Sequence, residues 1–182
     1  ELLTLAQARG RAMVADPDTC GAMAAIAADH EQTMAVIGDE HNLWIANLNA
    51  PRQTVVSGDR QAVETLVERL RRQGMEATLL RVRQAFHTPA MAGVATVFAD
   101  LLREFRFEPP ERKVISTVTG IPLPDDTDIT RYLCDQLVSP VRFLTAARLA
   151  AQEVDLLLEV GPGHVLTHLV NGFRKRAWMS CA

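Results

Sequence analysis

Several features that mark secreted, membrane or nucleic-acid-binding proteins are scarce in this sequence. The three cysteines, Cys20, Cys134 and Cys181, lie far apart and form no Cys-x-x-Cys pair, so neither a disulfide framework nor a zinc knuckle is indicated. No apolar run approaches the ~20 residues that span a bilayer, and the first residues lack the basic start and cleavage pattern of a signal peptide. The sequence therefore favours neither secretion nor membrane insertion, and a reducing cytoplasm fits it best.

Strong charge of one sign is also missing. The formal net charge is -3, and the basic residues form short local clusters on a slightly acidic chain, so nucleic acid is not an expected partner. The chain does have 182 residues, 48% of them hydrophobic. That is enough for one globular core, or for a core that carries a small satellite subdomain.

The pattern between residues 21 and 82 predicts a small mixed subdomain. Its second helix follows the capping residue Asp59 and stops at Gly74. Strands are predicted over 21–28, 43–50, 52–58 and 75–82, and helices over 29–38 and 60–72. The resulting order βαββαβ predicts a ferredoxin-like small subdomain over residues 21–82.

Residues 1–20 and 83–182 are predicted to belong to a larger α/β subdomain. Helices are predicted over 2–13, 92–105, 128–138, 142–152 and 164–173, and strands over 112–120 and 154–160. This alternation is typical of a parallel sheet covered by helices. Because two strands do not make a stable sheet alone, we expect their partners in sequence upstream of the first residue.

His87, in the segment RQAFHTPAM, is the first candidate for chemistry. It follows the last predicted strand of the small subdomain, and Pro89 fixes the backbone beyond it. This places it where the subdomain rejoins the larger one, and ligand sites often lie at such seams. Taken alone, however, a histidine without a visible partner is more often structural or exposed than catalytic.

Two other motifs point to simple structural roles. His164 and His168 have the i, i+4 spacing of a zinc-binding His-Glu-x-x-His helix, but Val165 replaces the glutamate and no third ligand is evident. We therefore predict no metal. The sequence Gly161-Pro162-Gly163 has Leu166 where a dinucleotide fingerprint needs its third glycine, so a tight strand-to-helix turn explains it.

Six segments together resemble a known family: LAQARGRAM, GAMAAI, ANLNAPRQTVVSG, QAFHTPAM, DQLVSPVRF and LLLEVGPGHVLTHL. Their order and spacing are similar to those of the malonyl-CoA:acyl carrier protein transacylase family, and most of all to the acyltransferase domains of polyketide synthases. The resemblance covers nearly the whole chain. It implies an α/β-hydrolase-like parallel-sheet domain with a ferredoxin-like small subdomain.

The resemblance also implies a reaction and its partners. A malonyl group would pass from coenzyme A, through a seryl ester, to the phosphopantetheine thiol of an acyl carrier protein in a ping-pong transfer. No cofactor is expected within the domain. Acyl-CoA, the acyl carrier protein and neighbouring polyketide synthase domains such as a ketosynthase are the expected partners.

Individual residues acquire roles from the same resemblance. His87 matches the family's general base, which takes a proton from serine and returns one to the leaving thiol. Arg9 matches the arginine that holds the free carboxylate of malonyl, for which a planar guanidinium is suited. Gln136 matches a residue whose backbone carbonyl orients the histidine. Asn47 and Asn49 match an Asn-x-Asn near the cleft, although a strand-end turn explains them almost as well.

Substrate selectivity is suggested by Gln84, Ala85 and Phe86, the three residues before His87. They resemble the His-Ala-Phe-His of malonyl-selective domains more than the Tyr-Ala-Ser-His of methylmalonyl-selective ones. Phe86 would fill the room that an α-methyl group needs, so malonyl is expected, although Gln84 departs from both patterns. A pocket discriminates one carbon by only ~1–3 kcal/mol.

The family's serine nucleophile has no counterpart in the sequence. The resemblance implies a Gly-His-Ser-x-Gly elbow upstream of the first residue, and no such context surrounds Ser57, Ser116, Ser139 or Ser180. We therefore expect residues 1–182 to be the C-terminal part of a larger acyltransferase and to be inactive alone. Two alternatives stay open: an inactive remnant that serves as a carrier-protein or linker docking module, and an unrelated α/β domain with a structural role.

Overall fold

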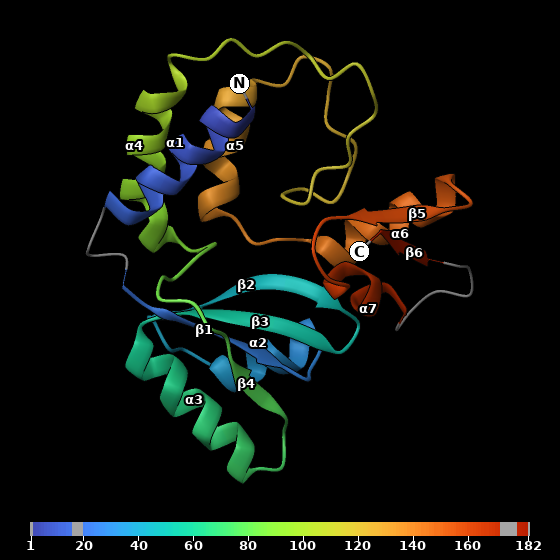
Figure 1. Ribbon diagram of the computed structural model, residues 1–182. Coiled ribbons are helices and arrows are strands. Elements are labelled where there is room, and N and C mark those ends of the chain that lie inside the picture. Colours follow the sequence, from blue (N-terminus) through green and yellow to red (C-terminus); the bar gives the residue numbers. More distant parts are fainter. Residues whose placement is uncertain (1, 16–19, 172–177, 182) are drawn as a thin grey trace.

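A four-stranded antiparallel sheet lies between two groups of helices (Figure 1). The computed structural model describes residues 2–15, 20–171 and 178–181. The sheet contains β1 (Ala22–Ile26), β2 (Leu43–Ala50), β3 (Gln53–Gly58) and β4 (Ala77–Leu79), in the order β2-β3-β1-β4. β1 is therefore central, and its Ala24 lies opposite Val56 on one side and Leu79 on the other.

Two helices cover one face of this sheet, α2 (His30–Ile37) and α3 (Arg60–Arg72) (Figure 1). α2 starts in a capping box, in which the Asp29 carboxylate accepts from the Gln32 N–H and the Gln32 side chain accepts from the Asp29 N–H. α3 starts at Asp59, whose carboxylate accepts from the N–H of Ala62. The apolar stripe of α3 is buried against the strands and consists of Val63, Leu66, Val67 and Leu70.

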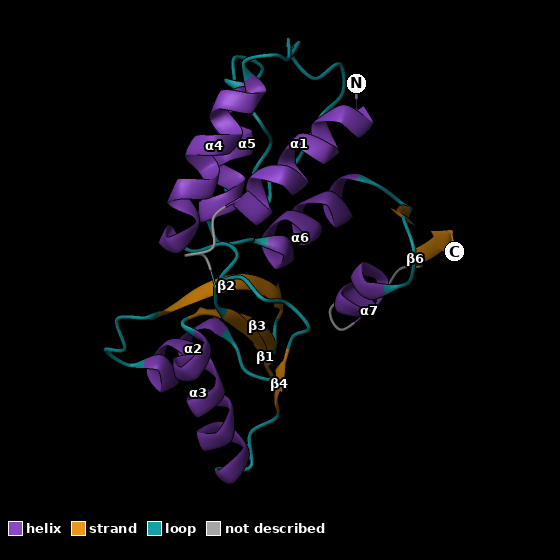
Figure 2. Cartoon of the chain, turned by 60° about the vertical axis from the view of Figure 1, so that its left-hand side comes forward, coloured by secondary structure: helices purple, strands orange, loops and turns teal. Residues whose placement is uncertain are grey.

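The opposite face of the sheet packs against Phe86. This face contributes Met23, Ala46 and Val55, all buried. Phe86 also packs against a second core, formed mainly by α1 (Leu2–Ala15), the short 3₁₀ helix Pro89–Met91, α4 (Ala92–Leu102) and α5 (Ile129–Val138). These three α-helices lie side by side in Figure 1 and again, turned by 60°, in Figure 2. The segment around Phe86 is thus the joint between sheet and helices.

The C-terminal region adds α6 (Phe143–Glu153), β5 (Leu157–Val160), α7 (Val165–Asn171) and β6 (Trp178–Cys181). β5 and β6 form a two-stranded parallel sheet. The buried carboxylate of Glu159 accepts from the backbone N–H groups of Leu166 and Thr167 and from the Thr167 hydroxyl. This side chain holds the start of α7 against β5. The predicted last residues of this helix, Gly172 and Phe173, lie outside the described residues.

The strand predicted over residues 112–120 is wrong. This segment is a loop that folds back on itself: the Ser116 N–H donates to the Ile121 carbonyl, and the Leu123 N–H donates to the Val114 carbonyl. Because these backbone groups pair within the loop, they do not pair with a neighbouring strand. Conversely, β6 was not predicted. None of the helices in the described part of the chain has the length and apolar character needed to cross a membrane.

Candidate active site

The backbone at His87 makes a sharp turn where the sheet joins the helices. His87 has φ 61°, in the left-handed region that residues other than glycine rarely occupy. Its N–H donates to the Leu137 carbonyl on α5 at 3.2 Å. The next side chain, that of Thr88, is fully buried and donates to the Ala85 carbonyl at 2.7 Å. The turn is therefore fixed on both sides, by α5 and by its own flanking residues.

The imidazole of His87 is held in one tautomer. Its Nδ1 lies 3.0 Å from the carbonyl oxygen of Gln136 on α5. Because a carbonyl oxygen only accepts, Nδ1 must donate, and Nε2 is left with a free lone pair. The backbone carbonyl of Gln136, which was expected to orient this histidine, therefore contacts its ring.

Burial lowers the pKa of His87 below its usual 6.5. The hydrogen bonds to the backbone of Gln136 and Ser139 act in the opposite direction, and the positive charge of Arg9 adds to the lowering. The net effect keeps the imidazole neutral near pH 7. A neutral imidazole with a free Nε2 can accept a proton, as a general base must.

His87 and Arg9 line the same cavity, which has a volume of about 230 Å³. Arg9 comes from α1, so two distant parts of the chain meet there. No carboxylate within the described ranges forms an ion pair with Arg9. The other lining residues come from the loop after α4 and from the end of α5 and the linker that follows it: Thr117, Val118, Gln136, Ser139, Pro140 and Val141. The cavity therefore offers a cation beside a neutral base.

Strand β2 is hydrogen-bonded to the cavity wall. The Leu48 N–H donates to the Val141 carbonyl, and the Val141 N–H donates to the Ala46 carbonyl, each at 2.8 Å. This bridge pairs Asn47 with Val141, so Asn47 lies next to a residue of the cavity wall. Asn49 is half-buried further along β2. Neither asparagine is among the residues that line the cavity.

The three positions expected to set selectivity are not part of the cavity lining. The side-chain amide of Gln84 donates to the Met13 carbonyl near the end of α1, Ala85 is buried, and Phe86 packs between the two cores. None of the three is among the lining residues. Sequence reasoning missed the loop residues Thr117 and Val118, which belong to the segment predicted as a strand.

The serines differ in their surroundings. Ser57 is buried within β3 and Ser116 is buried within the loop after α4. Ser139 lines the cavity as the residue that ends α5. The side chain of Ser180 lies outside what the structure describes. The His87 cavity thus contains Ser139 but no serine on a strand-to-helix elbow among the described residues.

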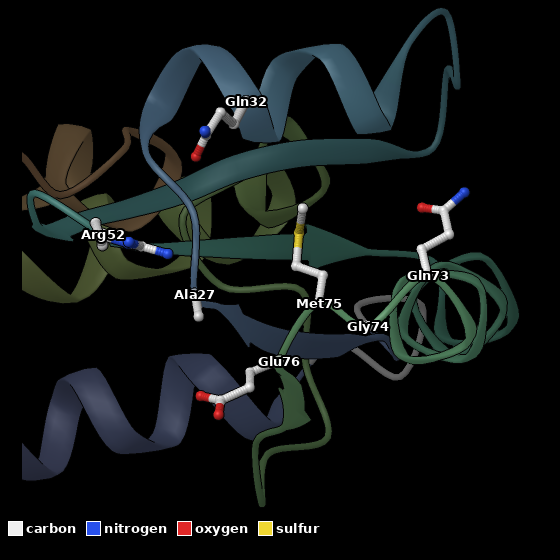
Figure 3. Close-up of a pocket in the computed structure, with 7 residues that line it drawn as sticks. All are labelled: Ala27, Gln32, Arg52, Gln73, Gly74, Met75 and Glu76. Atoms are coloured by element: carbon white, nitrogen blue, oxygen red, sulfur yellow. The ribbon is translucent and has the colours of Figure 1, made fainter.

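Other candidate sites carry no comparable chemistry. The rings of His164 and His168 meet edge to face, with centroids 6.4 Å apart, and the described residues contain no group of three or more side chains arranged to hold a metal ion. A larger hollow of about 460 Å³ lies beside α2 and the C-terminal end of α3, among residues that flank the strands (Figure 3). It is lined by Ala27, Gln32, Arg52, Gln73, Gly74, Met75 and Glu76, none of which is an expected site residue.

A mixed α/β chain that places a neutral histidine in one cavity with an arginine that has no ion-pair partner among the described residues fits a class of enzyme that activates a nucleophile and holds an anionic substrate. Comparison with protein families makes the class specific. The family model described as acyl transferase domain matches residues 1–181. The chain belongs to this family.

Individual relatives and solved structures agree with this assignment. The chain is 35% identical over 167 residues to the spectinabilin polyketide synthase system protein NorB of Streptomyces orinoci, covering 90% of this chain and 8% of that protein. It is 31% identical over 177 residues to a malonyl CoA-acyl carrier protein transacylase of Bacillus subtilis, covering 93% of this chain and 44% of the relative. The crystal structure of the acyltransferase domain of an iterative polyketide synthase in enediyne biosynthesis superimposes with a TM-score of 0.87 and 36% identity, covering 98% of this chain and 47% of the other.

The match therefore extends over nearly the whole chain but over only part of its relatives. The chain spans about half the length of the transacylase and of the enediyne acyltransferase domain. Its mixed α/β fold with a small antiparallel sheet is that of acyltransferase domains.

Proposed function

We propose that these residues form the histidine-bearing part of a polyketide synthase acyltransferase domain. The complete domain moves a malonyl-type extender unit from coenzyme A to the phosphopantetheine thiol of an acyl carrier protein, next to domains such as a ketosynthase and in the cytoplasm. The observation that carries the proposal is the common cavity of His87 and Arg9, in which Nδ1 of His87 is bonded to the Gln136 carbonyl.

His87 is the proposed general base. The fixed Nδ1–H leaves Nε2 to take the proton of a serine hydroxyl, supplied by a part of the domain outside these residues. The serine oxygen attacks the thioester carbonyl, the bond to sulfur breaks, and the imidazolium returns its proton to the coenzyme A thiolate. The second half-reaction runs the same steps in reverse, with the phosphopantetheine thiol as the attacking group.

Arg9 is the proposed anchor for the free carboxylate of the malonyl group. Its guanidinium can donate two parallel hydrogen bonds to a carboxylate, which acetyl lacks. The absence of an ion pair to Arg9 among the described residues supports this role, because the charge is left available to a ligand. The same charge favours neutral His87, so both residues serve the reaction.

The remaining assignments follow from the resemblance. Residues 21–82 are proposed to be a ferredoxin-like subdomain, and residues 1–20 and 83–182 a larger, α/β-hydrolase-like subdomain. The strand order β2-β3-β1-β4, with both helices on one face of the sheet, supports the ferredoxin-like assignment. Malonyl is the proposed extender unit. Phe86 with Gln84 and Ala85 would act on selectivity through packing, since none of them is a lining residue of the cavity.

The test is brief exposure of the full-length protein to malonyl-CoA, followed by intact-mass analysis and peptide mapping. A malonyl adduct on a serine outside residues 1–182 is expected, with its formation slowed by about 10²–10⁴-fold in His87→Ala. The same measurement on residues 1–182 alone should give no adduct. A Ser139→Ala variant serves as control, because Ser139 is the serine that lines the described cavity.

The competing proposal is an inactive docking module that binds the acyl carrier protein or a linker. Carrier-protein binding by a full-length protein that forms no malonyl adduct would support the docking module and overturn the enzyme proposal.

A further inference from the structure

Part of the His87 cavity is lined by a loop to which the proposed mechanism gives no role. Thr117 and Val118 line this cavity together with Arg9 and His87. In the proposed mechanism, Arg9 binds the carboxylate of the acyl group, and His87 is the general base for the attack on the thioester carbonyl at the other end of that group. The carbon between these two groups must therefore contact other lining residues, among which Val118 supplies an apolar side chain.

A buried serine anchors this loop to the helix that orients the base. Ser116 is fully buried, and its Oγ accepts from the Val118 N–H at 3.1 Å and from the Tyr132 hydroxyl at 3.0 Å. Tyr132 lies on α5, one turn before Gln136, whose carbonyl holds His87. The same helix thus fixes both the base and the loop, and so sets the separation between them.

Two further anchors restrain the loop. The Arg142 N–H donates to the Thr117 carbonyl at 2.6 Å. Gly120, with φ 82°, packs so closely on α6 that a Cβ there would lie 2.7 Å from Thr145 Cγ2. A wall held at three points does not adapt easily to a larger ligand, and a rigid wall discriminates by volume.

We infer that Val118 is a specificity-determining residue, forming with Thr117 the wall that a substituent on the acyl α-carbon meets. Tyr132 is a positioning residue, since its hydrogen bond to Ser116 sets where that wall stands. The inference rests on the proposed acyltransferase function and identifies what limits the size of its acyl group.

The test uses the full-length protein and an equimolar mixture of malonyl-CoA and methylmalonyl-CoA, with the two acyl-enzyme masses compared. Val118→Ala should raise the methylmalonyl to malonyl ratio by about ten-fold or more, since one methylene in a pocket changes selectivity by about 10–200-fold. Val118→Leu should lower the ratio. Val97→Ala is the matched control, because it removes the same atoms from an exposed side chain on α4 that is not part of the lining, and it should leave the ratio unchanged.

Tyr132→Phe tests the positioning role, because it keeps the ring and removes the hydroxyl. It should shift the ratio in the Val118→Ala direction, and the two changes combined should give less than the product of their separate effects, because they act on one wall. A shift of the unfolding midpoint without a change in ratio would reduce Tyr132 to a structural role and overturn its assignment.

The outcomes separate this inference from the function on which it rests. If the wild-type protein forms malonyl adducts but Val118→Ala leaves the ratio unchanged, or if Val97→Ala changes it equally, the Val118 wall is wrong and the acyltransferase stands. If the wild-type protein forms no malonyl adduct, the proposed function fails and the inference fails with it.

Discussion

Nδ1 of His87 and the carbonyl oxygen of Gln136 lie 3.0 Å apart, although 49 positions separate the two residues in the chain. This contact determines which ring nitrogen carries the proton and which is free to react. It also ties the base to α5, so that any shift of this helix moves the base. The following predictions test the consequences of this arrangement.

The first prediction concerns the pH dependence of the reaction. Burial and the Arg9 charge both lower the pKa of His87, and only neutral His87 acts as a base, so kcat/KM should fall as pH drops through that pKa. Arg9→Gln removes the positive charge and so raises the pKa of His87. The decrease of kcat/KM at acidic pH should therefore begin at a higher pH in this variant. The rate should be measured with acetyl-CoA, which has no free carboxylate for Arg9 to bind. Arg11→Gln, a change at an exposed position on the same helix, should leave the pH dependence of kcat/KM unchanged. An equal shift of the pH dependence in both variants would contradict the prediction.

The second prediction uses the backbone strain at His87. At an ordinary exposed helix position alanine is more stable than glycine by about 0.5–1 kcal/mol. At φ 61° the order should reverse, because glycine occupies this region freely and alanine does not. Both variants lose the imidazole, so His87→Gly should be more stable than His87→Ala by roughly 1 kcal/mol.

Urea unfolding of the two His87 variants measures this difference. Thr96→Gly and Thr96→Ala on the exposed surface of α4 provide the control pair with the ordinary order. If alanine were the more stable residue at both positions, the strain at His87 would be refuted. The prediction matters for function because a strained catalytic residue implies that surrounding contacts hold it in place.

Much of the fold could be predicted because local patterns determine it. The predicted range of α3 matches the observed Arg60–Arg72, since Asp59 caps its start and four regularly spaced apolar side chains bury one face. β2 likewise matches its prediction over Leu43–Ala50. By contrast, residues 112–120 have the β-branched composition of a strand, but their backbone pairs within a loop and no local rule identifies the partner.

The candidate site could be predicted only in part, for a related reason. Resemblance pointed to His87, Arg9 and Gln136, and these residues do meet around one cavity. The lining by Thr117 and Val118 could not be found, because the packing of Gly120 on α6 and the Tyr132 hydrogen bond bring this loop to the site. Such contacts link distant segments and leave no periodic signal in the sequence.

The third prediction compares two glycines with positive φ. Gly74 has φ 79° and open space where a Cβ would be, whereas at Gly120 a Cβ would meet Thr145 Cγ2 at 2.7 Å and Thr145 Cβ at 3.0 Å. Gly74→Ala should therefore lower the free energy of unfolding only through the strain of a positive φ at alanine, by about 1–2 kcal/mol. Gly120→Ala should lower the free energy of unfolding by roughly 1–3 kcal/mol more than Gly74→Ala, because the added methyl group overpacks against α6. Chemical denaturation of both variants measures the difference, and equal losses would show that the loop yields without cost.

The fourth prediction concerns Glu159, which holds the start of α7. The Thr167 hydroxyl bonded to its carboxylate is the main cause that lowers the pKa of Glu159, and the backbone N–H groups of Leu166 and Thr167 add to it against the opposing effect of burial. A carboxyl whose pKa is lowered by folding contributes stability that is fully present above its unfolded value of about 4.3 and is lost as pH falls through the folded value. Glu159→Gln should therefore lower the unfolding midpoint at pH 7.

The difference in unfolding midpoint between wild type and Glu159→Gln, called the gap below, should narrow as the pH is lowered toward 3. The reason is that protonation of the wild-type carboxyl removes the same charge as the substitution does. Thermal unfolding followed by circular dichroism across this range measures the gap. Glu111→Gln, at an exposed position, is the matched control and should track the wild type at every pH. A gap at pH 7 that persists unchanged at low pH would assign the loss to altered packing of the side chain, and the carboxylate would then not be what holds α7 to β5.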